Sequence, residues 1–584
     1  MKQLLFILLF LIATLHLNAQ YYLRGDVKDE KGNLLPDVKI NLFSKGNYAY
    51  TSGNSGYFGI PTNMEIDTIT LNYQGYEILK RGIQTKKYQS LVMKMLPAMA
   101  SMMKNKLASV TKNLLKEQST FFSAMGESYS SLIENDFVVT QKYPETGFAL
   151  NIDRASYSNA RRFINNEVLV PTDAVRIEEM LNYFDFNCLK QQIKKDEFGI
   201  STYMTNCPWN ATNQLLYLNL KAPKLNLDTV PSSNFVFLID ISGSMDKPTR
   251  LPLVQAAFKM LTDNLREKDT VAIVVYGGGV YQPLLPTSGA EKQKIKTIID
   301  SLTASGDTPG EGAITTAYNS ARRSFIKNGN NRVILATDGD FNVGQTSEKQ
   351  LEELIVHERQ SGIYLTCLGV GMGDYKDSKL EALAKKGNGN FAYIDNLKEA
   401  EKVLVTEFTK TLYSVANDSY LNINFNAAAV KEYRLIGFDN KKTAIEDSTS
   451  ELEGGEVGSG HSMIAIFEIT PATTILNSNA TIANATLQFK LPNTNTVRYQ
   501  RINIPYAVKD IYKSDSSIRF AASVAMFGSL LKQSRHSKTF TFMDVYNLAS
   551  TAANTSDYAQ KEFLALLQKA HKLYTPKKKK KSMD

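Results

Sequence analysis

The sequence predicts a multidomain α/β protein with a central, doubly wound (Rossmann-like) parallel sheet, preceded by a β-sandwich and followed by a β-rich domain. Between about residues 231 and 415, runs that are apolar throughout, at 235–239, 271–275, 333–336 and 363–370, alternate with amphipathic stretches of helix length. Strands that are apolar on both faces must be covered on both sides, so this pattern indicates a parallel sheet between two layers of helices. In such sheets ligands bind at the carboxyl ends of the strands.

The flanking segments have different patterns. Residues 20–95 contain short runs of alternating apolar and polar residues separated by Gly, Asp and Asn, as in an antiparallel β-sandwich. Apolar residues between Leu107 and Leu115 have helical spacing, which predicts a linker with one amphipathic helix. The expected order is signal peptide 1–19, β-sandwich 20–95, linker 96–135, an N-terminal associated segment 136–230, central domain 231–415, C-terminal domain 416–576 and basic tail 577–584.

Length and composition indicate a folded protein of several domains. The chain has 584 residues, of which 43% are hydrophobic and 21% charged, and this length suggests about four domains. The formal net charge of +9 includes the lysines at 577–581 and Lys2, so the rest of the chain is nearly balanced. We therefore expect no nucleic-acid partner, and only a weak contact of the basic tail with an anionic envelope surface.

The N-terminus predicts export. Lys2 precedes an apolar run at 4–15, and the small residue Ala19 follows at a suitable cleavage point. The run is shorter than the ~20 residues that span a bilayer. No cysteine follows it to carry a lipid, and no other stretch is long enough to span. We expect cleavage after Ala19, no transmembrane segment in the mature chain, and an extracytoplasmic location in the periplasm, at the cell surface or in the medium.

The cysteines and one group of charged residues are expected to be structural. Cys367 lies in an apolar run and is expected to be buried. Cys188 and Cys207 leave a disulfide possible without requiring one, because three cysteines cannot form a disulfide scaffold. Arginines and glutamates at 161–162 and 178–179 indicate a solvent-exposed helix face, to which we assign no chemistry.

Five oxygen-bearing side chains follow strands or occupy loops of the central domain. Asp240, Ser242 and Ser244 begin where the first buried strand ends, Thr308 lies in a later loop, and Asp338 follows the strand at 333–336. All can meet at one edge of the sheet, and hydroxyl and carboxylate oxygens are the donors that Mg²⁺ prefers. The alternative is that the serines and aspartates only cap the following helices.

The pattern Asp-x-Ser-x-Ser with a later Thr and a strand-end Asp resembles the metal-ion-dependent adhesion site of the von Willebrand factor type A (VWA) domain. The neighbouring sequence, including residues 330–344 and 387–395, is similar to that of a group of secreted bacterial VWA proteins. The resemblance covers most of 137–570. It implies that these five residues bind Mg²⁺ or Mn²⁺, directly or through water, and that an acidic residue of a protein partner fills an open coordination position. Asp307, beside Thr308, departs from the pattern, in which a small or uncharged residue is expected. The extra carboxylate would raise the affinity for a cation but repel an acidic ligand.

Residues 25–32, 35–38, 56–60 and 75–76 resemble the carboxypeptidase D regulatory-like domain, a non-catalytic accessory sandwich. This resemblance implies a spacer or accessory role for the N-terminal domain.

We therefore expect an exported, non-catalytic binding protein with an adhesion role. Two alternatives stay open. One is a structural module of a cell-envelope assembly with a vestigial metal site. The other is metal-assisted hydrolysis, for which Asp307 or Asp340 would supply the general base.

Overall fold

The structure is a computed structural model that describes residues 21–94 and 127–575, apart from gaps at 31, 47, 54, 74–75, 131, 151–152, 187–192, 194–195, 227–229, 307–309, 340–347, 374, 439, 442–454, 473–479, 493 and 495. The expected signal peptide, linker helix and basic tail, and Cys188, lie outside the described residues. The chain divides into two compact units, residues 1–108 and 109–584.

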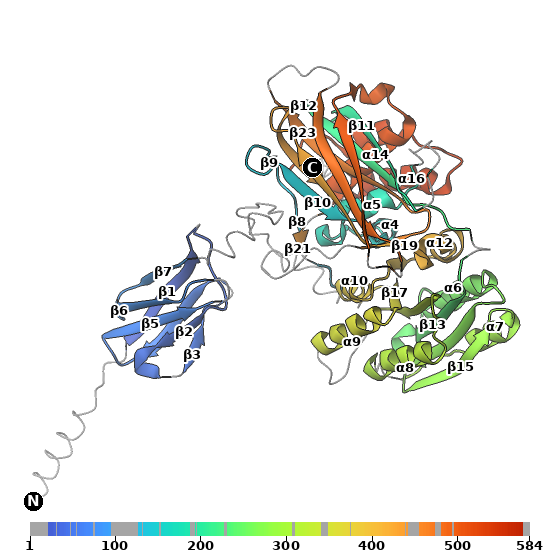
Figure 1. The fold of residues 1–584 in the computed structure, drawn as a ribbon, viewed down its shortest axis with the longest axis horizontal. Helices are drawn as coiled ribbons and strands as arrows, with labels where there is room; N and C mark the ends of the chain where they lie inside the picture. The colour runs from blue at the N-terminus through green and yellow to red at the C-terminus, as the bar shows by residue number, and fades with distance from the viewer. Residues whose placement is uncertain are drawn as a thin grey trace, which may run out of the picture. The chain divides into compact units, whose positions relative to one another are not determined.

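The first unit is a β-sandwich (Figure 1, blue). One sheet has the order β4 (Tyr57–Thr62), β1 (Tyr21–Asp29) and β7 (Gln89–Met93). The other has the order β3 (Ala49–Thr51), β2 (Lys39–Leu42), β5 (Ile66–Asn72) and β6 (Leu79–Gln84), with a 3₁₀ turn η2 (Phe43–Lys45) after β2. Apolar residues of both sheets, including Leu23, Ile40 and Leu71, share one core. The pairs are antiparallel as expected, except β1 with β7, where the first and last strands run in parallel.

The second unit contains the expected parallel sheet. Its order is β15 (Val280–Ser288), β14 (Thr270–Tyr276), β13 (Ser233–Asp240), β16 (Asn330–Thr337), β17 (Ile363–Val370) and β18 (Phe391–Ile394), all parallel except β15. Along β13, Phe235, Phe237 and Ile239 belong to the core on one face, and Val236 and Leu238 to the core on the other. This alternation within a continuous apolar run confirms the doubly wound prediction.

Helices cover both faces of this sheet (Figure 1). One core includes residues of α6 (Leu251–Asp263), α7 (Lys292–Asp300), α11 (Leu397–Glu401), the π-helical turn η5 (Lys402–Thr406) and α12 (Phe408–Leu412). The opposite core includes residues of α8 (Gly310–Arg323), α9 (Glu348–Gln360) and α10 (Asp377–Lys386). Cys367 is fully buried there, as expected, and within the described part of the chain Cys207 and Cys367 are free thiols.

The segments before and after the central sheet build one joint structure. A six-stranded sheet has the order β26 (Val508–Lys509), β11 (Gly199–Cys207), β12 (Asn210–Lys221), β23 (Ser462–Pro471), β20 (Val430–Ile436) and β9 (Val138–Val139). A second sheet has the order β10 (Glu145–Ala149), β19 (Ser414–Phe425), β24 (Thr481–Lys490) and β25 (Val497–Pro505), with β22 (Gly455–Gly458) also on β19. The short strands β8 (Leu132–Ile133) and β21 (Asn440–Lys441) form a separate pair. Both larger sheets therefore contain strands from 136–230 and from 416–576.

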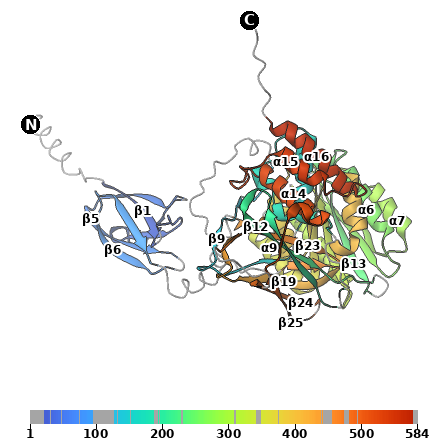
Figure 2. The ribbon, with the colours of Figure 1, turned by 90° about the horizontal axis from the view of Figure 1, so that it is seen from above.

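A helical layer covers the outer face of the six-stranded sheet. It consists of α4 (Ala155–Asn165), α5 (Ile177–Asn182), α14 (Ser516–Leu531), α15 (Phe542–Ser550) and α16 (Tyr558–Tyr574), with 3₁₀ turns η3 (Thr172–Ala174) and η6 (Ile511–Lys513). Figure 2 shows α14, α15 and α16 lying together on one side of the unit. No helix in the described part of the chain is long and apolar enough to cross a membrane.

Candidate metal centre at the carboxyl edge of the central sheet

Asp240 and Asp338 lie at the ends of neighbouring strands. Asp240 is the last residue of β13, and Asp338 directly follows β16. The two strands are parallel and in register up to Ile239 and Ala336, so both carboxylates reach the same edge. Both side chains are buried, with 0% and 2% of their surface exposed. The structure thus brings together the two strand-end aspartates that the sequence singled out.

The Asp240 carboxylate is held by three donors. Its Oδ1 accepts the backbone N–H of Ser242 at 2.9 Å, and its Oδ2 accepts the hydroxyls of Thr337 at 2.8 Å and Tyr276 at 3.2 Å. Burial raises the pKa of Asp240 to about 6, although the hydrogen bonds from Ser242 and Thr337 favour the charged form. A divalent cation beside this group would also favour its ionised form.

The two serines connect this turn to Asp338. Ser242 Oγ lies 3.1 Å from Ser244 Oγ, and Ser244 Oγ donates to Asp338 Oδ2 at 2.7 Å. Ligand oxygens around an octahedral Mg²⁺ lie about 3 Å apart, because each is ~2.1 Å from the ion. These three oxygens therefore have the chemistry and the spacing of one side of a magnesium site. Ser242 is buried and Ser244 is exposed, so this side is reached from solvent.

The loop that carries Thr308 is attached to the same turn. Thr308 lies outside the described residues, as do Asp307 and Asp340. Before it, Ser305 N–H donates to the carbonyl of Ile241 at 2.7 Å, and Gly243 N–H donates to the carbonyl of Gly306 at 2.9 Å. Gly306 has φ +73°, and a Cβ there would lie 2.3 Å from the Cα of Gly278. These contacts bring the preceding part of the loop to the turn that carries Ser242 and Ser244.

The capping alternative does not describe this turn. After β13 the chain forms a single 3₁₀ turn, η4 (Gly243–Met245), and the next helix, α6, starts only at Leu251. Within these described residues, neither η4 nor α6 receives a hydrogen bond from the side chain of its N-cap residue, Ser242 or Arg250. The oxygen-bearing side chains instead contact one another across two strands.

Arg250 is a member of the site that the sequence analysis missed. It is 3% exposed, and its Nη1 donates to Asp338 Oδ2 and, at 2.7 Å, to the carbonyl of Ser244. Its Nη2 donates to the carbonyl of Met372 at 2.5 Å. An arginine at the start of an amphipathic helix is ordinary in sequence, so only a pairing rule that spans 88 residues could have identified it.

A second acidic cluster lies elsewhere in the unit. Carboxylate oxygens of Asp153, Glu179 and Glu381, all buried, lie within 4.8 Å of one another. Lys385 Nζ lies 2.6 Å from Glu381, and Arg176 pairs with Glu179. Burial raises the pKa of Asp153 to about 7, opposed by the charge of Lys385. Because the positively charged side chains of Lys385 and Arg176 already pair with two of these carboxylates, we interpret the triad as part of an ion-pair network between the helical layer and α10.

The arginines at 161–162 are not on a solvent-exposed face. Arg161 is 2% exposed and donates to Asp395 at 2.8 Å, Glu399 at 2.7 Å and Glu562 at 2.9 Å. Arg162 pairs with Glu127 at 2.9 Å. That expectation was wrong because the partners come from distant segments, which bury α4 between the central sheet and α16.

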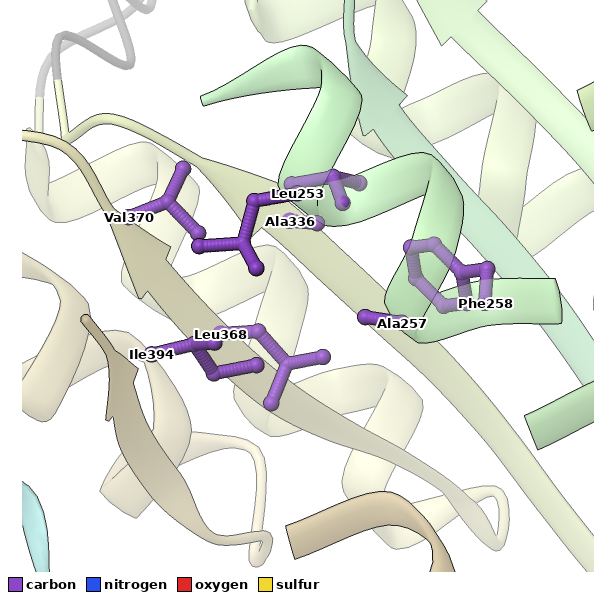
Figure 3. Close-up of a pocket in the computed structure, with 8 residues that line it drawn as sticks. Leu253, Ala257, Phe258, Ala336, Leu368, Val370 and Ile394 are labelled. Atoms are coloured by element: carbon purple, nitrogen blue, oxygen red, sulfur yellow. The ribbon is translucent and has the colours of Figure 1, made fainter. Parts of the chain in front are cut away.

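A space between α6 and the sheet has no metal-binding character (Figure 3). Leu253, Val254, Ala257 and Phe258 of α6 line it together with Ala336, Leu368, Val370 and Ile394 of the sheet. This lining is entirely apolar, so the space is part of the core. Asp240 and Asp338 lie instead at the ends of β13 and β16.

Comparison with known protein families gives three matches along the chain. Models described as "von Willebrand factor", "von Willebrand factor type A domain" and "Uncharacterized protein YfbK, C-terminal" match residues 123–217, 234–406 and 410–573. The first and third matches cover the two segments that build the joint structure, and the second covers the central sheet.

Among individual proteins, the chain is 35% identical over 464 residues to "Uncharacterized protein YfbK" of Escherichia coli K12, covering 76% of this chain and 80% of that protein. It is 26% identical over 185 residues to the magnesium-chelatase 67 kDa subunit of Chlorobaculum tepidum, covering 29% of this chain and 30% of that subunit. A solved von Willebrand factor type A structure from Catenulispora acidiphila matches with a TM-score of 0.39 and 15% identity, over 64% of this chain and 89% of that one.

Proposed function

Because the chain belongs to the YfbK family of VWA domain-containing proteins, we propose that its VWA domain binds Mg²⁺ or Mn²⁺ and docks an acidic group of a protein partner. The VWA domain is a protein-interaction module, which supports a binding role over a catalytic one. The observation that carries the proposal is the chain of oxygens from Ser242 through Ser244 to Asp338 at the sheet edge.

The residues at the sheet edge would have different roles in such a site. Ser242, Ser244 and Asp338 would be the ligands nearest the ion, and Asp240, which orients the turn through the Ser242 N–H, would add negative charge behind them. Thr308 is proposed as a further ligand from the neighbouring loop. The bound ion would supply an electrophilic position at which a carboxylate replaces water. Docking of this kind needs no covalent chemistry.

The setting of the site is part of the proposal. A signal peptide at 1–19 would export the chain, and the N-terminal sandwich would act as an accessory domain of the carboxypeptidase regulatory-like kind. The lysine tail would add a weak attraction for anionic envelope surfaces.

A second candidate function is a structural module of a cell-envelope assembly whose metal site is vestigial. The contact of Arg250 with Asp338 favours it, because a guanidinium already neutralises one of the proposed ligands. Cation binding separates the two candidates.

Direct titration of the full chain with Mn²⁺, followed by electron paramagnetic resonance, tests the main proposal. We expect one site with a dissociation constant at or below the millimolar range, and loss of binding in Asp338→Asn. Asp300→Asn is the matched control, because Asp300 is exposed and pairs only with Lys259 among the contacts described. Absence of Mn²⁺ uptake by the wild-type chain would leave the structural-module function.

Partner docking needs its own experiment. Capture of envelope proteins on the immobilised chain, with Mg²⁺ and with EDTA, should yield a partner that is lost in EDTA and in Asp338→Asn. A partner retained equally under all three conditions would contradict docking through the ion.

A further inference from the structure

We propose that Arg250 sets the cation affinity of this site by competing with the ion for Asp338, and that it couples cation binding to the loop that follows β17. The inference rests on the proposed function, since it concerns the same site. Arg250 is a positioning residue here, not a ligand.

The competition follows from the shared oxygen. Asp338 Oδ2 accepts both the Ser244 hydroxyl and Arg250 Nη1, so the guanidinium lies beside the ligands proposed for the ion. Both Arg250 and Asp338 are almost fully buried, at 3% and 2% exposure, where charges are screened less than at the surface. A divalent cation bound there would meet the positive charge of Arg250 within a few ångströms. Its binding is therefore weaker than the same oxygens would give alone.

The other terminal nitrogen of the guanidinium, Nη2, contacts the loop at 371–373. Arg250 Nη2 donates to the carbonyl of Met372 at 2.5 Å, and a Cβ on Gly371, which has φ +82°, would lie 2.5 Å from Arg250 Nε. The loop backbone thus lies in direct contact with the Arg250 side chain. A cation that pushes Arg250 away from Asp338 would also loosen this contact.

The same loop is held from its other side by the helical layer. Arg162 Nη1 donates to the carbonyl of Gly371 at 3.2 Å, and Gly373 N–H donates to Glu127 Oε1 at 3.0 Å. Arg162 and Glu127 are themselves paired. The loop therefore connects the proposed metal site to α4 and to the segment at 127–130. Cation binding at Asp338 would thus alter contacts outside the central sheet.

The test compares Mn²⁺ affinity in four full-length chains: wild type, Arg250→Gln, Arg250→Lys and Arg266→Gln. Arg266 is a matched control, because it also pairs with a buried aspartate, Asp269, but at the opposite end of the sheet, before β14. We expect Arg250→Gln to bind Mn²⁺ at least about tenfold more tightly. In this variant the ion no longer has to displace the charged hydrogen bond between Arg250 and Asp338. Arg250→Lys keeps the positive charge that repels the ion and should stay within about threefold of the wild type, as should Arg266→Gln.

Equal or weaker Mn²⁺ binding by Arg250→Gln, with a wild type that binds, would overturn the competition and leave the proposed function intact. Absence of binding in all four chains would overturn both. Hydrogen exchange on the wild type supplies a measurement that needs no variant: saturating Mn²⁺ should speed exchange at 371–373 several-fold. Unchanged exchange at these amides in a chain that binds Mn²⁺ would refute the coupling.

Discussion

Replacement of Arg161 by methionine should destabilise the second unit strongly, because this side chain joins three segments. Arg161, on α4, pairs with Asp395 after β18, with Glu399 on α11 and with Glu562 on α16. Asp395 and Glu399 are 7% and 3% exposed, whereas Glu562 is 21% exposed. The methionine would fill much of the volume but leave two buried carboxylates without this cation.

The size of the loss follows from that burial. Removing one partner of a buried ion pair costs about 3–5 kcal/mol, and the more exposed Glu562 adds at most about 1 kcal/mol. Burial also raises the pKa of Asp395, and Arg161 opposes this. A carboxyl whose folded pKa is raised loses stability as pH rises from its unfolded pKa to its folded one, so the cost of Arg161→Met should be larger at pH 7.5 than at pH 5.

Urea unfolding followed by tryptophan fluorescence measures this loss. The chain has a single tryptophan, Trp209, which packs against Phe540 in the second unit and so reports on that unit. Lys259→Met is the control, since it breaks an exposed pair with Asp300 and should cost less than about 1 kcal/mol. The triple variant with Asp395→Asn and Glu399→Gln should recover part of the loss. A loss below about 1 kcal/mol in Arg161→Met, or no difference between the two pH values, would refute the reasoning.

Two further outcomes are expected from other parts of the second unit. Glu407 is buried, which alone would raise its pKa, but Arg154, Lys402 and Lys410 lower it to about 2. The ionised Glu407 therefore stabilises the folded state by about 3 kcal/mol above pH ~5, and this stabilisation is lost as pH falls toward 2. In Glu407→Gln the free energy of unfolding should depend less on pH over this window. Gly306→Ala should lower Mn²⁺ affinity, because a Cβ would lie 2.3 Å from Gly278 Cα and displace the loop that leads to Thr308; calorimetric titration with unchanged affinity would contradict this role.

The sequence by itself determined the central sheet and the position of the candidate site. Apolar runs such as 235–239, separated by amphipathic stretches of helix length, predict parallel strands covered on both faces, and a carboxylate directly after such a strand emerges at its carboxyl edge. Both statements depend only on residues close together in the chain. For that reason the sequence alone assigns Asp240, Ser242, Ser244 and Asp338 to one edge of the sheet, and the first three to their order along the turn.

Only the tertiary structure decided how the flanking segments combine and which charges meet. Strands from 136–230 and 416–576 lie in the same two sheets, and β12 pairs with β23 across some 250 residues of sequence. Arg161 pairs with Glu399 across 238 residues and Arg250 with Asp338 across 88, and the triad of Asp153, Glu179 and Glu381 also joins distant segments. Short-range patterns reveal which face of a strand or helix is apolar. They do not specify which distant carboxylate will neutralise a buried arginine, because that choice is made when the packed elements exclude water around both charges.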